Sequence, residues 1–265
     1  MRPEKMILEN SWKEYLANAR AAIAFGLLLF FVPFLLLDFF ASQNMFFSSG
    51  SFFIEYNIVN PAVFIVEFAL ASVFLVFFAF FVSLIVFGVR KNISKVRVEY
   101  YLAEMVRKFS VKIFLFFWLY MIAFFAFGFL AVTFMEPVSG VLFVSLALLV
   151  LSLLFMFVPQ AIVVDEVGVL DAIKESFSFI TKNISSFLMV LAMGSVLTAA
   201  VLLLEYALDF IALDILPGRF VAVLVMLVFV VPFLEVLKTY MYLMKFDLVK
   251  MSEIAHTVGF GKKRR

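Results

Sequence analysis

The sequence predicts an all-α integral membrane protein with about six transmembrane helices, joined by amphipathic helices at the cytoplasmic membrane interface. Three observations predict this fold class. Of the 265 residues, 66% are hydrophobic and only 15% are charged. The hydrophobic residues form runs long enough to cross a bilayer, and the basic residues gather in alternate loops. A soluble domain of this size could not remove so much apolar surface from water.

Six hydrophobic runs are long enough to be spans, because a helix that crosses a hydrocarbon core of roughly 30 Å needs about 20 residues. The predicted spans lie near residues 19–40, 61–89, 111–135, 139–164, 184–208 and 219–244. Backbone groups inside a bilayer must bond to one another, so each run is expected to be helical. We therefore expect one polytopic membrane domain over residues 1–265.

The positions of lysine and arginine predict the orientation. The residues on one side of a six-span topology include Arg2, Lys5, Lys13, Arg20, Arg90, Lys91, Lys95, Arg97, Arg107, Lys108, Lys112, Lys174, Lys182, Lys245, Lys250, Lys262, Lys263, Arg264 and Arg265. The loops of the other side hold only Arg219 as a basic residue. Basic residues mark the cytoplasmic side, so a multi-pass protein of the cell membrane with both termini in the cytoplasm is expected.

Three segments on this side have an apolar stripe at helical spacing: residues 6–18, 95–109 and 167–182. The apolar positions are Leu8, Trp12, Tyr15 and Leu16 in the first, Val98, Tyr101, Leu102, Met105 and Phe109 in the second, and Val167, Leu170, Ile173, Phe177 and Ile180 in the third. Such stripes are typical of helices that lie in the membrane interface. Helices packed on the cytoplasmic end of the bundle need the same stripe, and both interpretations stay open.

The segments also suggest an internal repeat. Ser11-Trp12 and Asn18 before the first span are echoed by Ser176-Phe177 and Asn183 before the fifth. A unit of one interfacial helix plus a two-span hairpin, used three times, would explain this spacing, and internal duplication is common in membrane folds. The middle segment fits the register poorly.

The stretch from Val158 to Phe177 carries a family resemblance. Its pattern is a proline near the inner end of a span, an acidic residue, a glycine turn, and Ala-x-x-x-Ser before an aromatic: Pro159, Asp165 or Glu166, Gly168, Ala172, Ser176 and Phe177. This pattern resembles a loose superfamily of uncharacterised bacterial and archaeal polytopic proteins. That group includes the membrane domain associated with glycerophosphodiester phosphodiesterases. This chain has fewer spans and no hydrolase domain, so the resemblance implies a membrane fold without phosphodiesterase activity.

The same residues have a structural interpretation. Pro159 lacks a backbone donor and is expected to kink or end its helix. Gly168 permits a turn that redirects the chain onto the membrane surface. The pattern would then serve to bend a span into an interfacial helix.

Groups for catalysis are scarce in the sequence. His256 is the only histidine, there is no cysteine, and neither a nucleophile elbow nor a phosphate-binding glycine loop is present. The protein is therefore expected not to be an enzyme and to need no metal or cofactor.

Charged residues inside the predicted spans are the sharpest functional candidates, because they cost free energy in a bilayer. They are Glu67, Glu205, Glu235 and Lys238. Glu235 and Lys238 are three residues apart, so they share a helix face and can pair, which favours a structural role. For Glu205 two interpretations stay open: an outer-surface pair with Arg219, or a protonatable pair with Glu67 facing a cavity.

Small residues at three- and four-residue spacing occur on two spans, at Gly194, Ser195, Thr198 and Ala199 and at Ala79 and Ser83. They let helix backbones approach closely, either within the bundle or in a homo-oligomer.

The leading functional hypothesis is a non-enzymatic module that organises membrane lipids, chiefly anionic headgroups at the cytoplasmic face, or a membrane-protein partner. The basic tail Lys262-Lys263-Arg264-Arg265 would be drawn to the same headgroups. No folded basic surface with stacking aromatics accompanies it, so nucleic acid is not expected as a partner. The alternative is a small-solute or ion transporter that uses Glu67 and Glu205.

Overall fold

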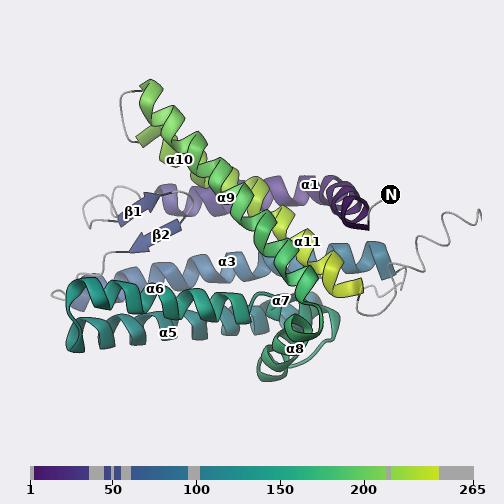
Figure 1. Cartoon of the computed structure of the whole chain (residues 1–265), viewed down its shortest axis with the longest axis horizontal. Helices are drawn as coiled ribbons and strands as arrows, with labels where there is room; N and C mark the ends of the chain where they lie inside the picture. Colours follow the sequence, from purple (N-terminus) through teal and green to yellow (C-terminus); the bar gives the residue numbers. More distant parts are fainter. Residues whose placement is uncertain are drawn as a thin grey trace, which may run out of the picture.

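In the computed structural model the protein is a helical bundle, and the predicted all-α membrane fold class is confirmed (Figure 1). The structure describes residues 3–35, 45–48, 51–54, 61–94, 102–212 and 216–244. Within these residues, five helical stretches are long and apolar enough to cross a membrane: Ala71–Ile93, Ala103–Ala131, Val138–Val164, Ile184–Ile211 and Phe220–Met244. They match the last five predicted spans, so the chain is a multi-pass membrane protein.

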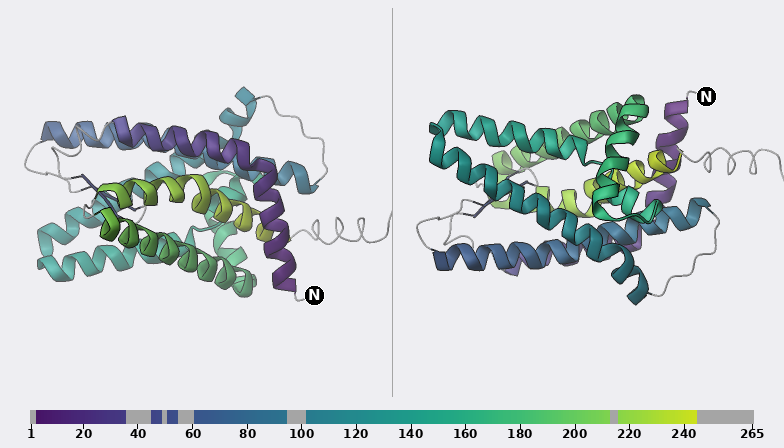
Figure 2. Two further views of the ribbon diagram at one scale, coloured as in Figure 1. Left: turned by 90° about the horizontal axis from the view of Figure 1, so that it is seen from above. Right: turned by 90° about the horizontal axis from the view of Figure 1, so that it is seen from below.

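The first helix, α1 (Pro3–Leu35), joins the first predicted interfacial segment to the start of the first predicted span. The sequence predicted two elements, but the helix is continuous and bends between them (Figure 2). Asn18 lies at the end of the interfacial segment, and its side-chain amide donates to the carbonyl of Glu14 at 2.9 Å. The last residues of the predicted span, 36–40, lie outside the described part of the chain.

A short β-hairpin follows α1, and the sequence reasoning did not anticipate it. Strands β1 (Met45–Ser48) and β2 (Ser51–Ile54) pair antiparallel, with Met45 opposite Ile54. In this register Phe46 is opposite Phe53 and Phe47 is opposite Phe52.

The middle of the chain forms α3 (Pro61–Ser94), α4 (Leu102–Met105), a π-helical turn η1 (Val106–Ser110), α5 (Val111–Phe134), α6 (Pro137–Leu154) and α7 (Val158–Val164). The fourth predicted span is therefore broken between α6 and α7. Pro159 is the second residue of α7, where a helix does not need its missing N–H. The predicted effect of Pro159 is thus seen as a helix break just before it.

The last part comprises α8 (Val169–Lys182), α9 (Ile184–Ala212), α10 (Leu216–Val225), the π-helical turn η2 (Met226–Val230) and α11 (Val231–Met244). Pro232 has no N–H to bond the carbonyl of Val228, four residues before it. The hydroxyl of Tyr15 in α1 donates to this carbonyl instead, at 3.3 Å. Gly26 allows the close approach of the two helices, because a Cβ there would lie 2.8 Å from the Leu227 carbonyl oxygen.

The helices at the end of each hairpin form a common core. Helices α3, α7 and α11 pack against one another in the centre. Each interfacial segment lies on the second span of the preceding hairpin: η1 on α3, α8 on α6 and α7, and the start of α1 on η2 and α11. This order of contacts is the one expected from three units of interfacial helix plus hairpin.

Candidate functional site

The turn between α7 and α8 contains the acidic residues of the family-like pattern. Glu166 has a positive φ of 59°, the left-handed conformation that non-glycine residues rarely adopt. Gly168 has an extended backbone, and a Cβ added to it would meet nothing within 4 Å. The expectation that Gly168 makes the turn is therefore wrong, because the chain reverses at Glu166 and Gly168 only precedes the first residue of α8.

The conformation of Glu166 is held by two cations from elsewhere in the chain. Its carboxylate accepts a hydrogen bond from Nη1 of Arg90 at 2.9 Å and pairs with the ammonium group of Lys108. Arg90 also donates to the Val163 carbonyl, at 2.5 Å. Since Arg90 lies near the end of α3 and Lys108 lies in η1, the turn between α7 and α8 is connected to both of these elements. Sequence periodicity could not reveal this, because the partners are 58 and 76 residues away.

Two further contacts complete this polar cluster, which we define as Arg90, Lys108, Lys112, Asp165 and Glu166. Lys112 donates to the carbonyl of Val167 at 3.1 Å, and Asp165 accepts a hydrogen bond from the hydroxyl of Tyr242. Burial alone would raise the pKa of Glu166, but the hydrogen bonds and charges of Lys108 and Arg90 outweigh it and hold the pKa below its ordinary value. The polar cluster carries three cations and two carboxylates, and thus has a net positive charge.

Ser176 connects α8 to the helix break. Its hydroxyl donates to the carbonyl of Leu154 at 2.8 Å and accepts from the backbone N–H of Phe157 at 3.3 Å. Both groups lack their regular helical partners because the helix is interrupted between Leu154 and Val158. Ala172 and Ser176 are completely buried, so they form the inner face of α8.

The exposed part of α8 carries both apolar and charged side chains. Leu170 is 72% exposed and Phe177 is 54% exposed, whereas Val167, Ile173 and Ile180 of the same apolar stripe pack against the core. The charged residues Asp171 and Lys174 lie next to the exposed apolar side chains and form an ion pair at 3.2 Å. The motif residues therefore separate: Ala172 and Ser176 point into the bundle, whereas Phe177 points out of it.

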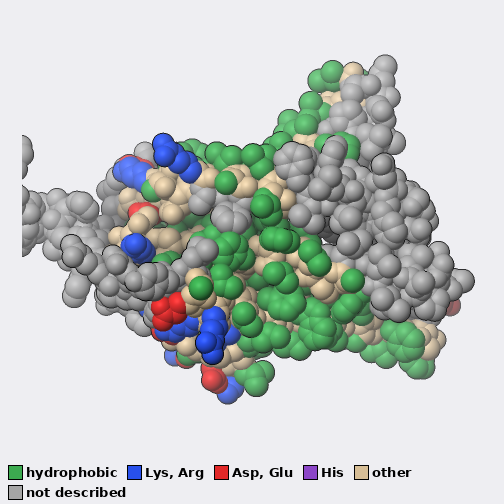
Figure 3. Space-filling model, turned by 180° about the vertical axis from the view of Figure 1, so that it is seen from behind, with side chains coloured by type: hydrophobic (Ala, Val, Ile, Leu, Met, Phe, Trp, Pro, Cys, Tyr) green, Lys and Arg blue, Asp and Glu red, His purple; other side chains and the backbone are tan. Residues whose placement is uncertain are grey.

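The charged side chains gather at the end of the molecule that contains α8. Figure 3 shows the lysine, arginine and acidic side chains gathered toward one end of the molecule, with apolar side chains over most of the remaining described surface. We call it the charged end, defined by Arg90, Lys108, Glu166 and Lys174. It is the predicted cytoplasmic end.

The predicted pair of Glu235 and Lys238 is present inside the last span, with a distance of 2.5 Å between Oε1 and Nζ. Gln160 of α7 adds a hydrogen bond from its amide nitrogen to the other oxygen of Glu235, at 2.7 Å. The Oε1 atom of Gln160 is buried and has no hydrogen-bond partner among the described residues. Sequence reasoning missed Gln160, although one amide within a long apolar run was a signal.

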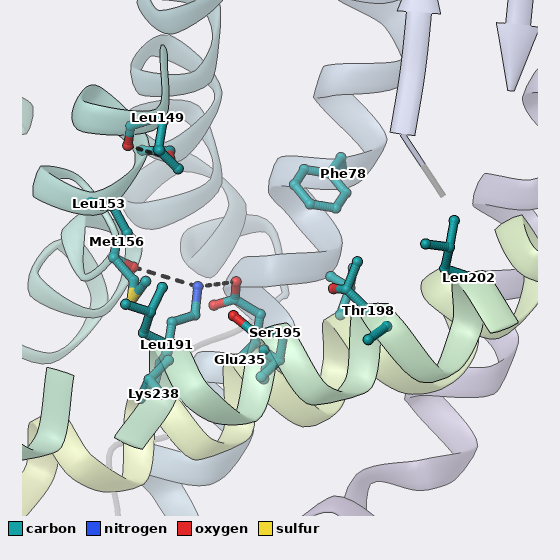
Figure 4. A pocket seen from close by; sticks show the side chains of 16 residues that line it. Phe78, Leu149, Leu153, Met156, Leu191, Ser195, Thr198, Leu202, Glu235 and Lys238 are labelled. Carbon is teal, nitrogen blue, oxygen red and sulfur yellow. Dashed lines mark hydrogen bonds and ion pairs between the residues drawn. The ribbon is translucent and has the colours of Figure 1, made fainter. Parts of the chain in front are cut away.

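This buried pair lies at one end of a cleft between α6, α9 and α11. The cleft has a volume of about 700 Å³, and most of its lining residues are apolar (Figure 4). The predicted small residues of α9 face it, namely Gly194, Ser195, Thr198 and Ala199. Nζ of Lys238 also reaches the Met156 carbonyl at 3.5 Å. The small residues thus line an opening instead of a tight helix contact.

The other predicted intramembrane acids are not brought to this cleft. Glu205 is buried near the outer end of α9 and is not a lining residue of the cleft. Its neighbour Asp209 accepts a hydrogen bond from the N–H of Gly218 at 3.0 Å and so caps the start of α10. The side chains of Glu67 and Arg219 lie outside the described part of the structure, so the predicted pairs of Glu205 stay predictions.

Among the described residues, no group of three or more His, Asp or Glu side chains could hold a metal ion. Comparison of the chain with known protein families, curated proteins and solved structures gives no match. The resemblance in the Pro159–Phe177 stretch therefore stays an expectation, and the function must be argued from the geometry.

Proposed function

We propose that the protein is a non-enzymatic module of the cell membrane that organises anionic lipids through the helices of its charged end. In this proposal the charged end faces the cytoplasm, as the distribution of lysine and arginine predicts. The observation that carries the proposal is that α8 buries one side against the bundle and exposes large apolar side chains beside charged ones on the other.

The side chains of α8 suit three different environments. Ala172, Ser176 and Phe179 are buried against the bundle. Leu170 and Phe177 are exposed and apolar, and Lys174 is exposed and charged. If α8 contacted only protein and water, the large apolar side chains of Leu170 and Phe177 would be exposed to water. A helix in the membrane interface places them in the acyl-chain boundary and its charges among the headgroups.

The interfacial part of α1 supports the same placement. Trp12 and Leu16 are exposed, while Ser11 and Tyr15 on the adjoining face are buried. Trp12 is held by edge contacts to the rings of Phe229 and Phe233. Tryptophan is enriched at membrane interfaces, where its ring can meet both acyl chains and headgroups.

The charged end can hold anionic headgroups. Lys91, Arg107 and Lys182 are exposed there, and the polar cluster beneath them is net positive. Each lysine or arginine near an anionic surface contributes about 1 kcal/mol to the attraction. The interfacial helices would therefore fix a shell of anionic lipid around the inner end of the bundle.

The proposal is tested by extracting the full chain in polymer-bounded membrane discs and measuring the co-extracted lipids. The wild type is expected to enrich anionic lipids over the bulk membrane. The double substitution Lys174→Gln and Lys182→Gln should reduce this enrichment, whereas Lys174→Arg with Lys182→Arg, which keeps the charge, should preserve it. Equal lipid compositions in the wild type and the Gln variant would contradict the proposal.

A further inference from the structure

The cleft between α6, α9 and α11 exists because two helices diverge. Helices α6 and α9 hardly contact each other, whereas the corresponding pairs, α3 with α5 and α11 with α1, are packed closely. Figure 1 shows α9 and α10 running away from α5 and α6 toward the end opposite the charged end. The last helix of one hairpin thus packs against the first helix of another in two cases, whereas an opening lies between α6 and α9.

The opening faces the membrane. Its rims come from the candidate spans Val138–Val164 and Ile184–Ile211, and Phe78 of α3 contributes to its wall. Leu149 on α6 is a large exposed side chain at one rim. Since these helices cross the hydrocarbon core, whatever enters from the side comes from an apolar medium.

The cleft is elongated. The lining residues of α9 extend from Val190 to Leu202, which is about 18 Å at the helical rise per residue. This length and the volume of about 700 Å³ suit extended hydrocarbon chains.

The inner end of the cleft is polar. Glu235 and Lys238 belong to its lining, and the carbonyl of Met156 accepts from Lys238. Behind them, the unpartnered Oε1 of Gln160 is a further acceptor at the same end. These groups can donate to and accept from the polar part of an amphiphile, while the rest of the cleft contacts only its chains.

We propose that this cleft binds the acyl chains of one membrane phospholipid, with the polar end of the lipid beside Lys238. The occupant follows from three observations: the lateral opening into the hydrocarbon core, the elongated and mostly apolar lining, and the charged pair at one end only. This site is distinct from the interfacial surface of α8, so the two proposals can fail independently.

The test uses the full chain, stripped of loosely bound lipid by extensive detergent exchange and examined by native mass spectrometry with a defined phosphatidylglycerol and phosphatidylethanolamine mixture. The wild type is expected to retain one phospholipid per chain. Thr198→Phe places a ring in the cleft and should abolish this retention. Ala200→Phe, on the exposed side of α9 away from the cleft lining, is the matched control and should retain the lipid.

Ser195→Leu provides a second, smaller filling of the cleft in case Thr198→Phe does not fold, which thermal unfolding would show. Retention of the lipid by a folded cleft-filling variant would overturn the proposal, as would a wild type that carries no lipid. A mass of two chains that the filling variants abolish would assign the cleft to a second copy and would equally overturn it.

Discussion

Ser176 of α8 donates its hydroxyl hydrogen to the carbonyl of Leu154, the last residue of α6, at a distance of 2.8 Å. One side chain thereby attaches the interfacial helix to the interrupted span. Because the chain between them passes through α7 and the Glu166 turn, this bond helps to fix the position of the whole segment from Val158 to Lys182. Such contacts fix the orientation of α8 relative to the bundle.

Ser176→Ala should therefore destabilise the protein. The Leu154 carbonyl and the Phe157 N–H would lose their shared partner, the fully buried Ser176, and an unsatisfied buried group costs about 1–3 kcal/mol. Ser178→Ala, two residues further along α8 and only partly buried, should have a much smaller effect. Thermal unfolding of both variants in the same detergent measures the difference, and equal midpoints would show that the hydroxyl of Ser176 has no such role.

Glu166 should make stability depend on pH. Its pKa in the folded protein lies below the ordinary value of 4.5, so the stabilisation is fully present above pH 4.5 and is lost as the pH falls through the lower folded pKa. Glu166→Gln should unfold at a lower temperature than the wild type at neutral pH, and the gap should narrow as the pH falls below 4.5. A gap that stays constant with pH would contradict the ion pairs with Arg90 and Lys108.

Gly26 should tolerate no side chain. A Cβ at this position would lie 2.8 Å from the Leu227 carbonyl oxygen and 2.9 Å from the Cα of Val228, so the helices would have to move apart. Gly26→Ala is expected to cost about 1–3 kcal/mol through overpacking. Gly128→Ala is the matched control, because a Cβ there meets nothing within 4 Å and alanine favours the helix. Similar unfolding midpoints for the two variants would argue against the contact of α1 with η2.

The Glu235–Lys238 pair should show strong coupling. Lys238→Met alone leaves the charge of Glu235 buried without its cation, which costs about 3–5 kcal/mol for a buried pair. The double substitution Glu235→Gln with Lys238→Met removes both charges and keeps an acceptor for the amide of Gln160, so it should recover much of the loss. A double-mutant cycle on the unfolding free energy measures the coupling, and additive effects would show that the pair does not act as one unit.

Much of the helix arrangement along the chain could be predicted from sequence. The predicted span 111–135 corresponds to α5, which ends at Phe134, and the predicted span 184–208 begins with α9 at Ile184. Hydrophobic runs give such bounds because the bilayer sets a minimum length for a span. The predicted segment 167–182 is likewise seen as α8, since its apolar stripe has helical spacing.

The site could be predicted only in part. The pairing of Glu235 with Lys238 follows from their spacing on one helix, and the structure contains it. The contacts of Glu166 with Arg90 and Lys108 join residues far apart in the sequence, and the divergence of α6 and α9 depends on how whole helices pack. Neither the hydrophobic periodicity nor the charge pattern of the sequence reveals these contacts or this divergence. The β-hairpin escaped notice because its residues are as apolar as the spans around it.

The proposed function depends most on the position of α8 in the membrane interface, and site-directed spin labelling tests this position directly. The chain has no cysteine, so single-cysteine variants can be labelled without further changes. Labels at positions 170 and 177 should be accessible to oxygen in the acyl-chain boundary, labels at 174 and 182 to a water-soluble nickel complex, and a label at 172 to neither. Accessibility of positions 170 and 177 to the nickel complex, equal to that of position 174, would place α8 in water and contradict the proposed function.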